Sequence, residues 1–316
     1  MTAARSSPAR ILVIKTGALG DFIQALGPMV AIRRHHPKAA ITLLTTAPFV
    51  DFGRACGYFD DIWLDPRPRG RDLAGWLRWG RRLRAGGFDR VYDLQNSERT
   101  ALYLWLFGGR RPEWVGAAWG ASHHNAAPSR IAGHAFAGHA QTLALAGIHD
   151  VQVDDMGWVP GDAGRFGLDR PYVLLVPGCA PAHPEKRWPA ARYGMLARHL
   201  DGLGFRPVVI GTAADADAAA VIRGIHPRAV DLTGKTTLFD IVLLARQAAA
   251  AFGNDTGPVH LIAATGCPVW TFFSRRSDPA RATPLGPRVT VLRRDDLADL
   301  GLDEVIQAVN GKDFRS

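Results

Sequence analysis

The stretch Arg10-Ile-Leu-Val-Ile-Lys-Thr-Gly-Ala-Leu-Gly-Asp21 decides the fold class of this chain. Its apolar run is short and contains β-branched residues, which predicts a buried strand over residues 10–15. Gly17 and Gly20 then mark a turn, and helical periodicity extends over residues 22–36 until Pro37 ends it. A strand, a glycine turn and a helix in this order are typical of a parallel sheet that is covered by helices on both faces.

The same alternation continues along the 316 residues and predicts an α/β protein with two Rossmann-like units. Periodicity lapses over residues 150–170, so we expect an N-terminal domain at 1–160 and a C-terminal domain at 161–316. Expected strands lie at 40–46, 61–64, 88–94, 171–176, 206–210, 228–232, 249–252 and 268–273. Expected helices lie at 73–85, 190–201, 213–223 and about 302–310, with others starting near Ser97, Thr237 and Gly257. Residues 116–140 show no clear period and are expected to form a loop before a helix near Gln141.

Composition excludes several classes of protein. Hydrophobic residues make up 47% of the chain and charged residues 21%, so it can build sizeable cores and is not disordered. No apolar run approaches the roughly 20 residues that span a bilayer, and residues 1–10 lack the apolar stretch of a signal peptide, so we expect a soluble, cytoplasmic protein. Cys56, Cys179 and Cys267 are scattered and no metal-ligating motif occurs. Neither a disulfide framework nor a tightly bound metal is therefore predicted.

The positive charge is concentrated in the first half of the chain. Residues 1–150 carry 19 basic and 11 acidic side chains, whereas residues 151–316 carry 19 and 18. The densest part, residues 67–84, combines seven arginines with Trp76 and Trp79. Such a segment favours a polyanion or an anionic lipid surface as partner, although an ordinary solvated helix face fits it equally well. No nucleic-acid-binding module accompanies the charge, so we expect no nucleic-acid partner.

Two apparent nucleotide motifs fail on spacing. A dinucleotide fingerprint needs three glycines in the turn after the first strand, but only Gly17 and Gly20 are present, and no acid ends the second strand. Gly234-Lys235-Thr236 imitates the end of a P-loop without its first glycine. Nicotinamide binding and P-loop chemistry are therefore disfavoured.

Three groups of polar residues follow expected strands and are candidates for a functional site. Asp21 opens the first helix at the carboxyl edge of the sheet, where its carboxylate could be a base or an ordinary helix cap. Lys186 and Arg187 lie in the loop after Pro177-Gly178 and could bind a phosphate, or the loop could be a plain surface loop. These groups share one property, which is that each lies where ligands bind in open α/β sheets.

The third group is the strongest local pattern, Phe252-Gly-Asn-Asp-Thr-Gly-Pro-Val-His260. A buried strand ends in turn formers, and Asp255 or Thr256 can cap the helix that carries Pro258 in its first turn. The amides near Gly257 would then form a diphosphate site at the helix N-terminus. His260 could donate to a phosphate oxygen or simply pack in the core.

Several blocks of the chain resemble, in order, the motifs of glycosyltransferase family 9, the ADP-heptose:lipopolysaccharide heptosyltransferases. They are Ile11-Leu-Val-Ile-Lys-Thr-Gly-Ala-Leu-Gly-Asp21, Tyr92-Asp-Leu-Gln95, Pro177-Gly178 with Lys186-Arg-Trp-Pro189, Leu232-Thr-Gly-Lys-Thr-Thr-Leu238, Gly253-Asn-Asp-Thr-Gly-Pro-Val-His-Leu261 and Ser277-Asp-Pro-Ala-Arg281. Together they span about residues 10–290. The long block that ends at Leu261 is the most specific of them.

The resemblance implies a GT-B architecture, in which two Rossmann-like domains flank a cleft and the last helix packs back toward the first domain. The first domain would bind the acceptor and the second the nucleotide sugar. The implied reaction is an inverting transfer of a heptose or related sugar from an ADP-sugar to a lipopolysaccharide core or other acidic glycan, with no cofactor and no metal. The enzyme would work as a cytoplasmic, peripheral protein at the inner membrane of a Gram-negative-type cell, with its basic first domain toward the anionic glycolipid acceptor.

The resemblance also implies roles for single residues. Asp21 matches the family's proposed base, and Lys186 matches its phosphate-binding lysine. The expected donor diphosphate site comprises Gly178, Arg187, Asp255, Thr256, Gly257 and His260. Three alternatives stay open: a nucleotide-sugar-binding protein without transferase activity, a family member with a different donor sugar, and a dehydrogenase or epimerase of the Rossmann type.

Overall fold

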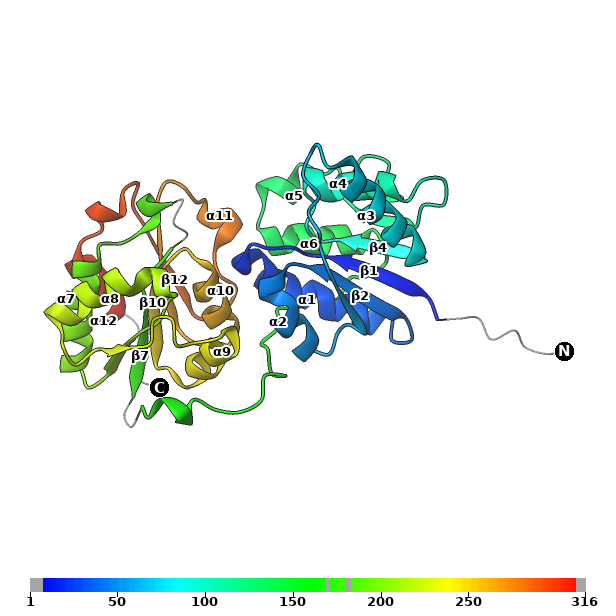
Figure 1. Ribbon diagram of the computed structural model, residues 1–316. Coiled ribbons are helices and arrows are strands. Elements are labelled where there is room, and N and C mark those ends of the chain that lie inside the picture. The colour runs from blue at the N-terminus through cyan, green and yellow to red at the C-terminus, as the bar shows by residue number, and fades with distance from the viewer. Residues whose placement is uncertain (1–7, 169–170, 180–182, 311–316) are drawn as a thin grey trace. The chain divides into compact units, whose positions relative to one another are not determined.

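The computed structural model describes residues 8–168, 171–179 and 183–310. The chain divides between Asp154 and Asp155 into two compact units, and each unit is built on a six-stranded parallel sheet (Figure 1). Helices cover the sheets because the strands are buried on both faces, as the apolar runs of the sequence predict. The predicted α/β class is confirmed.

The sheet of the first unit has the order β3-β2-β1-β4-β5-β6, with every neighbouring pair parallel. Its strands are β1 (Arg10–Ile14), β2 (Ala40–Thr45), β3 (Asp61–Leu64), β4 (Arg90–Asp93), β5 (Glu113–Gly116) and β6 (His123–His124). Its helices are α1 (Leu19–His35), α2 (Val50–Ala55), α3 (Leu73–Ala85), α4 (Glu98–Leu106), α5 (Ser129–Ala132) and α6 (Ala135–Ala144).

Helices α3 and α4 cover one face of this sheet. Trp79 and Leu83 of α3 and Tyr103 of α4 join Leu12 and Ile14 of β1 in one core cluster. Helix α1 packs against α6. Fully burying a side chain of this size contributes roughly 1.5–3 kcal/mol to the stability of the fold. These contacts therefore hold the carboxyl end of β1, and the turn after it, in a fixed position.

The sheet of the second unit has the order β12-β11-β10-β7-β8-β9 and is also parallel. Its strands are β7 (Tyr172–Val176), β8 (Arg206–Val209), β9 (Val230–Asp231), β10 (Ala250–Asn254), β11 (Val269–Phe273) and β12 (Val289–Arg293). Its helices are α7 (Ala190–Gly202), α8 (Ala216–Ile225), α9 (Leu238–Gln247), α10 (Gly257–Ala264), α11 (Pro279–Ala282) and α12 (Leu302–Asn310).

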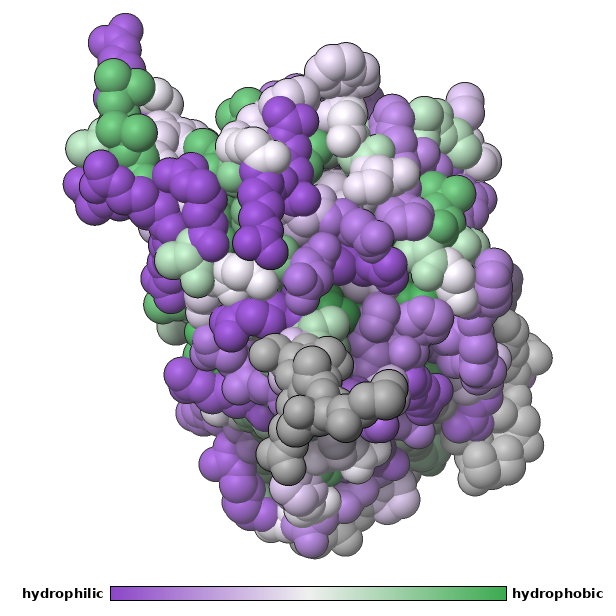
Figure 2. Space-filling view, turned by 90° about the vertical axis from the view of Figure 1, so that its right-hand side faces the viewer, coloured by the Kyte–Doolittle hydropathy of each residue, from purple (hydrophilic) through white to green (hydrophobic). Residues whose placement is uncertain are grey.

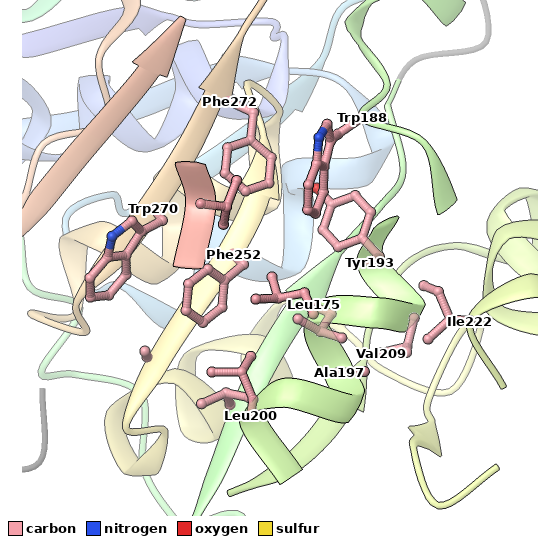
Figure 3. Close-up of a cluster of buried hydrophobic side chains, with 14 of the residues drawn as sticks. Leu175, Trp188, Tyr193, Ala197, Leu200, Val209, Ile222, Phe252, Trp270 and Phe272 are labelled. Carbon is pink, nitrogen blue, oxygen red and sulfur yellow. The ribbon is translucent and has the colours of Figure 1, made fainter. Parts of the chain in front are cut away.

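The core of the second unit is rich in aromatic side chains (Figure 3). The ring of Trp188 lies against Tyr193 and Phe272, with ring centroids 4.8 Å and 4.9 Å apart. Trp188 also donates from Nε1 to the carbonyl oxygen of Leu300 at 2.8 Å. The loop before α7 is therefore fixed to the core by a buried tryptophan.

Helix α12 packs against α7, and its Val305 and Val309 belong to the core of the second unit. Its expected packing toward the first unit stays a prediction. Within the described residues, no helix is both long enough and apolar enough to cross a bilayer. The face seen in Figure 2 is mostly hydrophilic, with hydrophobic residues in small groups.

Two sequence predictions about the local structure of the first unit are wrong. Residues 116–140 were expected to form a loop, but β6, α5 and the first part of α6 lie there. Strand β6 has only two residues and adds to the sheet through its pairing with β5, so no periodicity could reveal it. Asp21 is not the cap of the first helix, because α1 begins at Leu19 and its N-cap position is Ala18.

Candidate functional site

Strands β7 and β10 are neighbours in the second sheet, with Val176 paired to Gly253. The segments that follow them, Pro177-Gly178 and Asn254-Asp255, therefore leave the same carboxyl edge. This edge is the usual ligand-binding edge of an open parallel sheet. The structure thus brings together the two predicted groups of the second half.

Asp255 connects these two groups by an ion pair. Lys186 Nζ donates to Asp255 Oδ2 at 2.9 Å, and His260 Nε2 lies 3.6 Å from Asp255 Oδ1. Asp255 and His260 are buried, whereas the Lys186 side chain retains 20% of its exposure. The pair holds the ammonium at the edge of the sheet with part of its surface open to a ligand.

Asp255 is ionised at every physiological pH. Burial alone would raise its pKa, but hydrogen bonds from His260, Ser277 and Lys186, with the charge of Lys186, lower the pKa to about 2. The sequence analysis named Asp255 as a helix cap and as part of the expected diphosphate site, but it did not predict the ion pair between Asp255 and Lys186. His260 is buried in the core and is also a polar neighbour of Asp255, while its donation to a phosphate oxygen stays a prediction.

Helix α10 begins at Gly257 and has Thr256 at its N-cap position. The Thr256 side chain makes no capping hydrogen bond, so the predicted side-chain cap is wrong. Among the described residues no acceptor is bonded to the backbone amides of Thr256 and Gly257. Amides at a helix N-terminus carry partial positive charge and can bind a phosphate.

Arg187 and Gly178 are the two remaining predicted site residues of the second half. Arg187 is exposed and donates from Nη2 to the carbonyl oxygen of Cys179 at 3.2 Å. Gly178 is buried, and a Cβ at this position would lie 2.5 Å from Asp215 Oδ1. Only glycine therefore fits at this point of the loop.

In the first unit, Asp21 lies in the first turn of α1, after the carboxyl end of β1, and its side chain is exposed. Directly before the turn, Lys15 is buried with 3% exposure and donates from Nζ to the carbonyl oxygen of Leu94 at 3.1 Å. Burial lowers the pKa of Lys15, while the charges of Asp21 and Asp93 act to raise it.

Asp93 is a buried carboxylate at the same edge, and its backbone partners are the amides of Gln95 and Asn96 at 3.0 Å and 2.9 Å. Burial raises the pKa of Asp93 to about 6, although these hydrogen bonds and the charge of Lys15 oppose the rise. Sequence reasoning quoted Lys15 and Asp93 within motifs but gave neither a role. The signal available was a charged residue next to an apolar strand.

A cavity of about 500 Å³ lies at the opposite, amino edge of the first sheet. Its charges are largely used within the fold: Arg90 pairs with Glu113, and Arg84 and Arg111 donate to carbonyl oxygens near the end of α4. This cavity is remote from the turn that carries Asp21. It is therefore not the candidate site.

Two Rossmann-like units in one chain are the architecture of the GT-B class. Residues 146–301, just under half of the chain, match the sequence model of "Glycosyltransferase family 9 (heptosyltransferase)". The chain is therefore a glycosyltransferase, as the resemblance predicted.

Named relatives support the assignment. Lipooligosaccharide heptosyltransferase 2 of Haemophilus influenzae is 33% identical over 40% of this chain, a match that spans only 37% of that protein. Lipopolysaccharide heptosyltransferase 2 of Escherichia coli is 27% identical over 90% of this chain and 88% of that protein. The solved structure of E. coli ADP-heptose heptosyltransferase II superposes with a TM-score of 0.75 at 23% identity, over 96% of this chain and 98% of that one, which shows the fold.

No three His, Cys, Asp or Glu side chains gather as a metal site within the part of the chain that the structure describes. The iron-containing glycosyltransferase TibC of enterotoxigenic E. coli shares the fold with a TM-score of 0.54 and 19% identity, over 93% of this chain and 66% of that one. Catalysis without a metal therefore stays a prediction for this chain.

Proposed function

We propose that this enzyme transfers a heptose, or a related sugar, from an ADP-sugar to the core of a lipopolysaccharide or another acidic glycan. The observation that carries the proposal is the cluster of Lys186, Asp255 and His260 beside the open amides of Thr256 and Gly257. The family match and the named heptosyltransferases support the choice of donor and acceptor.

The second unit would hold the donor diphosphate. An ammonium has three hydrogens, so Lys186 can keep its bond to Asp255 and still donate to a phosphate oxygen. The amides of Thr256 and Gly257 add neutral donors that need no reorganisation when charge develops. Each hydrogen bond to the charged phosphate contributes roughly 1.5–3 kcal/mol.

Asp21 is the proposed base. It would take the proton from an acceptor hydroxyl while that oxygen forms a bond to the anomeric carbon of the donor sugar. The bond from this carbon to the diphosphate breaks, and the electron pair leaves with ADP, whose charge Lys186 and the helix amides stabilise. The configuration at the anomeric carbon inverts because attack and departure occur on opposite faces.

The first unit is the proposed acceptor-binding part. Residues 1–150 carry a charge excess of eight, which fits the phosphates and carboxylates of an acidic glycan. We expect no nucleic-acid partner, because no nucleic-acid-binding module accompanies this charge.

An anionic membrane surface is the second proposed partner of the first unit. Leu73 and Leu77 of α3 are 73% and 60% exposed, and Arg78 and Arg81 of the same helix are exposed beside them. Exposed leucines flanked by arginines are the pattern of a surface that adsorbs to anionic lipid. The proposed location is therefore peripheral, at the cytoplasmic side of the inner membrane.

The direct test is turnover of ADP-heptose with a lipopolysaccharide precursor that lacks the heptose, followed by mass spectrometry of the glycolipid. We expect a mass gain of one heptose and release of ADP. Binding of ADP with no transfer to any precursor would instead support a nucleotide-sugar-binding protein without transferase activity. Transfer from another nucleotide sugar would identify a different donor.

A further inference from the structure

The side-chain amide of Asn254, at the end of β10, connects three segments of the donor site. Asn254 is fully buried, and its Oδ1 accepts from the backbone amide of Trp188 at 2.9 Å and from the hydroxyl of Tyr193 at 3.1 Å. Its Nδ2 donates to the carbonyl oxygens of Pro177 at 2.8 Å and Gly178 at 3.4 Å. All four hydrogen-bonding positions of this amide are used.

The bond donated to the carbonyl oxygen of Pro177 fixes the direction of the peptide unit between Pro177 and Gly178. In a trans peptide the carbonyl and the following N–H point in opposite directions. Because the carbonyl of Pro177 points inward to Asn254, the N–H of Gly178 points away from Asn254. Among the residues that the structure describes, no acceptor is bonded to this N–H.

A second contact restricts Gly178. The carboxylate of Asp215 packs so closely on Gly178 that a Cβ would lie 2.5 Å away. Asp215 is itself fixed, because its Oδ2 accepts from the backbone amide and the hydroxyl of Thr212, each at 2.9 Å. The loop therefore has little freedom to rotate the Gly178 amide.

We propose that Asn254 is a positioning residue that orients the Gly178 amide as a donor to the diphosphate of the nucleotide sugar. The proposal rests on the function proposed above. Asn254 and the next residue, Asp255, thus position two different donors at one sheet edge, since Asp255 holds the ammonium of Lys186. Asn254 touches no phosphate itself and acts through the backbone of the neighbouring strand.

The substitution Asn254→Asp tests this role. It keeps an oxygen for Trp188 and Tyr193 but replaces the donor that faces Pro177 with a second oxygen, so the peptide unit loses its anchor. We expect the Kd for ADP, measured by calorimetry, to rise by about 10- to 100-fold, which corresponds to one lost hydrogen bond to a charged group. Affinity for adenosine, which has no phosphate, should change by less than about 2-fold.

Tyr193→Phe is the matched control, because it removes one of the two donors to Asn254 Oδ1 and leaves both bonds donated by Asn254 in place. It should lower the melting temperature but leave the Kd for ADP within about 2-fold. Asn254→Ser tests the role without a new charge and should also weaken ADP binding.

Unchanged ADP binding in both Asn254 variants, with the wild-type protein binding ADP, would overturn the proposal. An equal loss of ADP affinity in Tyr193→Phe would do the same, because it would show a general structural role. A wild-type protein that binds neither ADP nor ADP-heptose would overturn the donor site itself.

Discussion

At the scale of single residues, the proposed donor site depends on how charges are paired. Lys186 and Asp255 form an ion pair in which the acid is buried and the ammonium is partly open. Such a pair leaves the cation oriented and still able to bind an anion. Removing Lys186 and removing Asp255 should have different consequences. Loss of Lys186 leaves a buried carboxylate without its partner, which is unfavourable.

Lys186→Ala should raise the KM for ADP-heptose by about 10- to 100-fold, since one hydrogen bond to a charged phosphate is lost. Steady-state kinetics at saturating acceptor measure the change. Lys38→Ala, which removes an exposed lysine at the amino edge of the first sheet, is the control and should leave KM unchanged. An unchanged KM in Lys186→Ala would remove this lysine from the donor site.

Asp93 should make the stability of the protein depend on pH in a predictable direction. The folded state keeps its proton up to about pH 6, whereas an unfolded Asp releases it near pH 4. The folded chain then binds more protons between these values, so this group makes the free energy of unfolding fall as pH rises from 4 to 6. The contribution is roughly 2–3 kcal/mol.

Asp93→Asn should remove that part of the pH dependence. Urea denaturation of the variant at pH 4, 5, 6 and 7 measures the effect. Asp295→Asn, a change at an exposed acid, should follow the wild-type curve. If the wild-type and Asp93→Asn curves were parallel, the acid would titrate near its ordinary pKa.

At the scale of elements, the first unit exposes more large hydrophobic side chains than the second. Of the eleven large hydrophobic side chains that are exposed among the described residues, nine belong to the first unit. Leu73 and Leu77 lie on α3, and Leu102 and Trp105 lie on the adjacent α4. The arginines of α3 lie in the same layer, so apolar and cationic groups occur together.

The double variant Leu73→Ser and Leu77→Ser should reduce binding to anionic vesicles by about 10-fold or more. Burying each leucine side chain in the lipid interface contributes roughly 1.5–3 kcal/mol to the free energy of binding. Sedimentation with phosphatidylglycerol vesicles at low salt measures it. Met195→Ser, at an exposed apolar residue of the second unit, is the control. Equal sedimentation of the double variant and the wild type would count against α3 as the contact.

At the scale of the whole molecule, the chain places the proposed base and the proposed donor site in different units. Asp21 follows β1 of the first sheet, whereas Lys186 and Asp255 follow β7 and β10 of the second. Each unit has its own core, so a change at one site need not disturb the other. A substitution at Asp21 should therefore change kcat without changing the affinity for the donor nucleotide.

Asp21→Asn should lower kcat by roughly 10²- to 10⁴-fold if this residue is the base, while the Kd for ADP stays within about 2-fold. Rapid-quench turnover and calorimetry measure the two quantities. Asp51→Asn, which changes an exposed acid in the first turn of α2, should lower neither. Full activity of Asp21→Asn would exclude Asp21 as the base.

The sequence by itself determined most of the strands and helices, because buried strands and amphipathic helices leave local periodicity, but it did not predict β5, β6 and β12. The helices α3 and α12 and the strand β3 agree with their predicted bounds to the residue. It also determined which residue types follow the strands, and hence the chemistry of the site. Only the tertiary structure decided the contacts of Asn254 and Lys15 and the ion pair between Asp255 and Lys186, because these partners are 61 to 79 residues away along the chain. Hydrogen bonds between such distant residues form only when the sheet brings the strand ends together, and no local pattern records them.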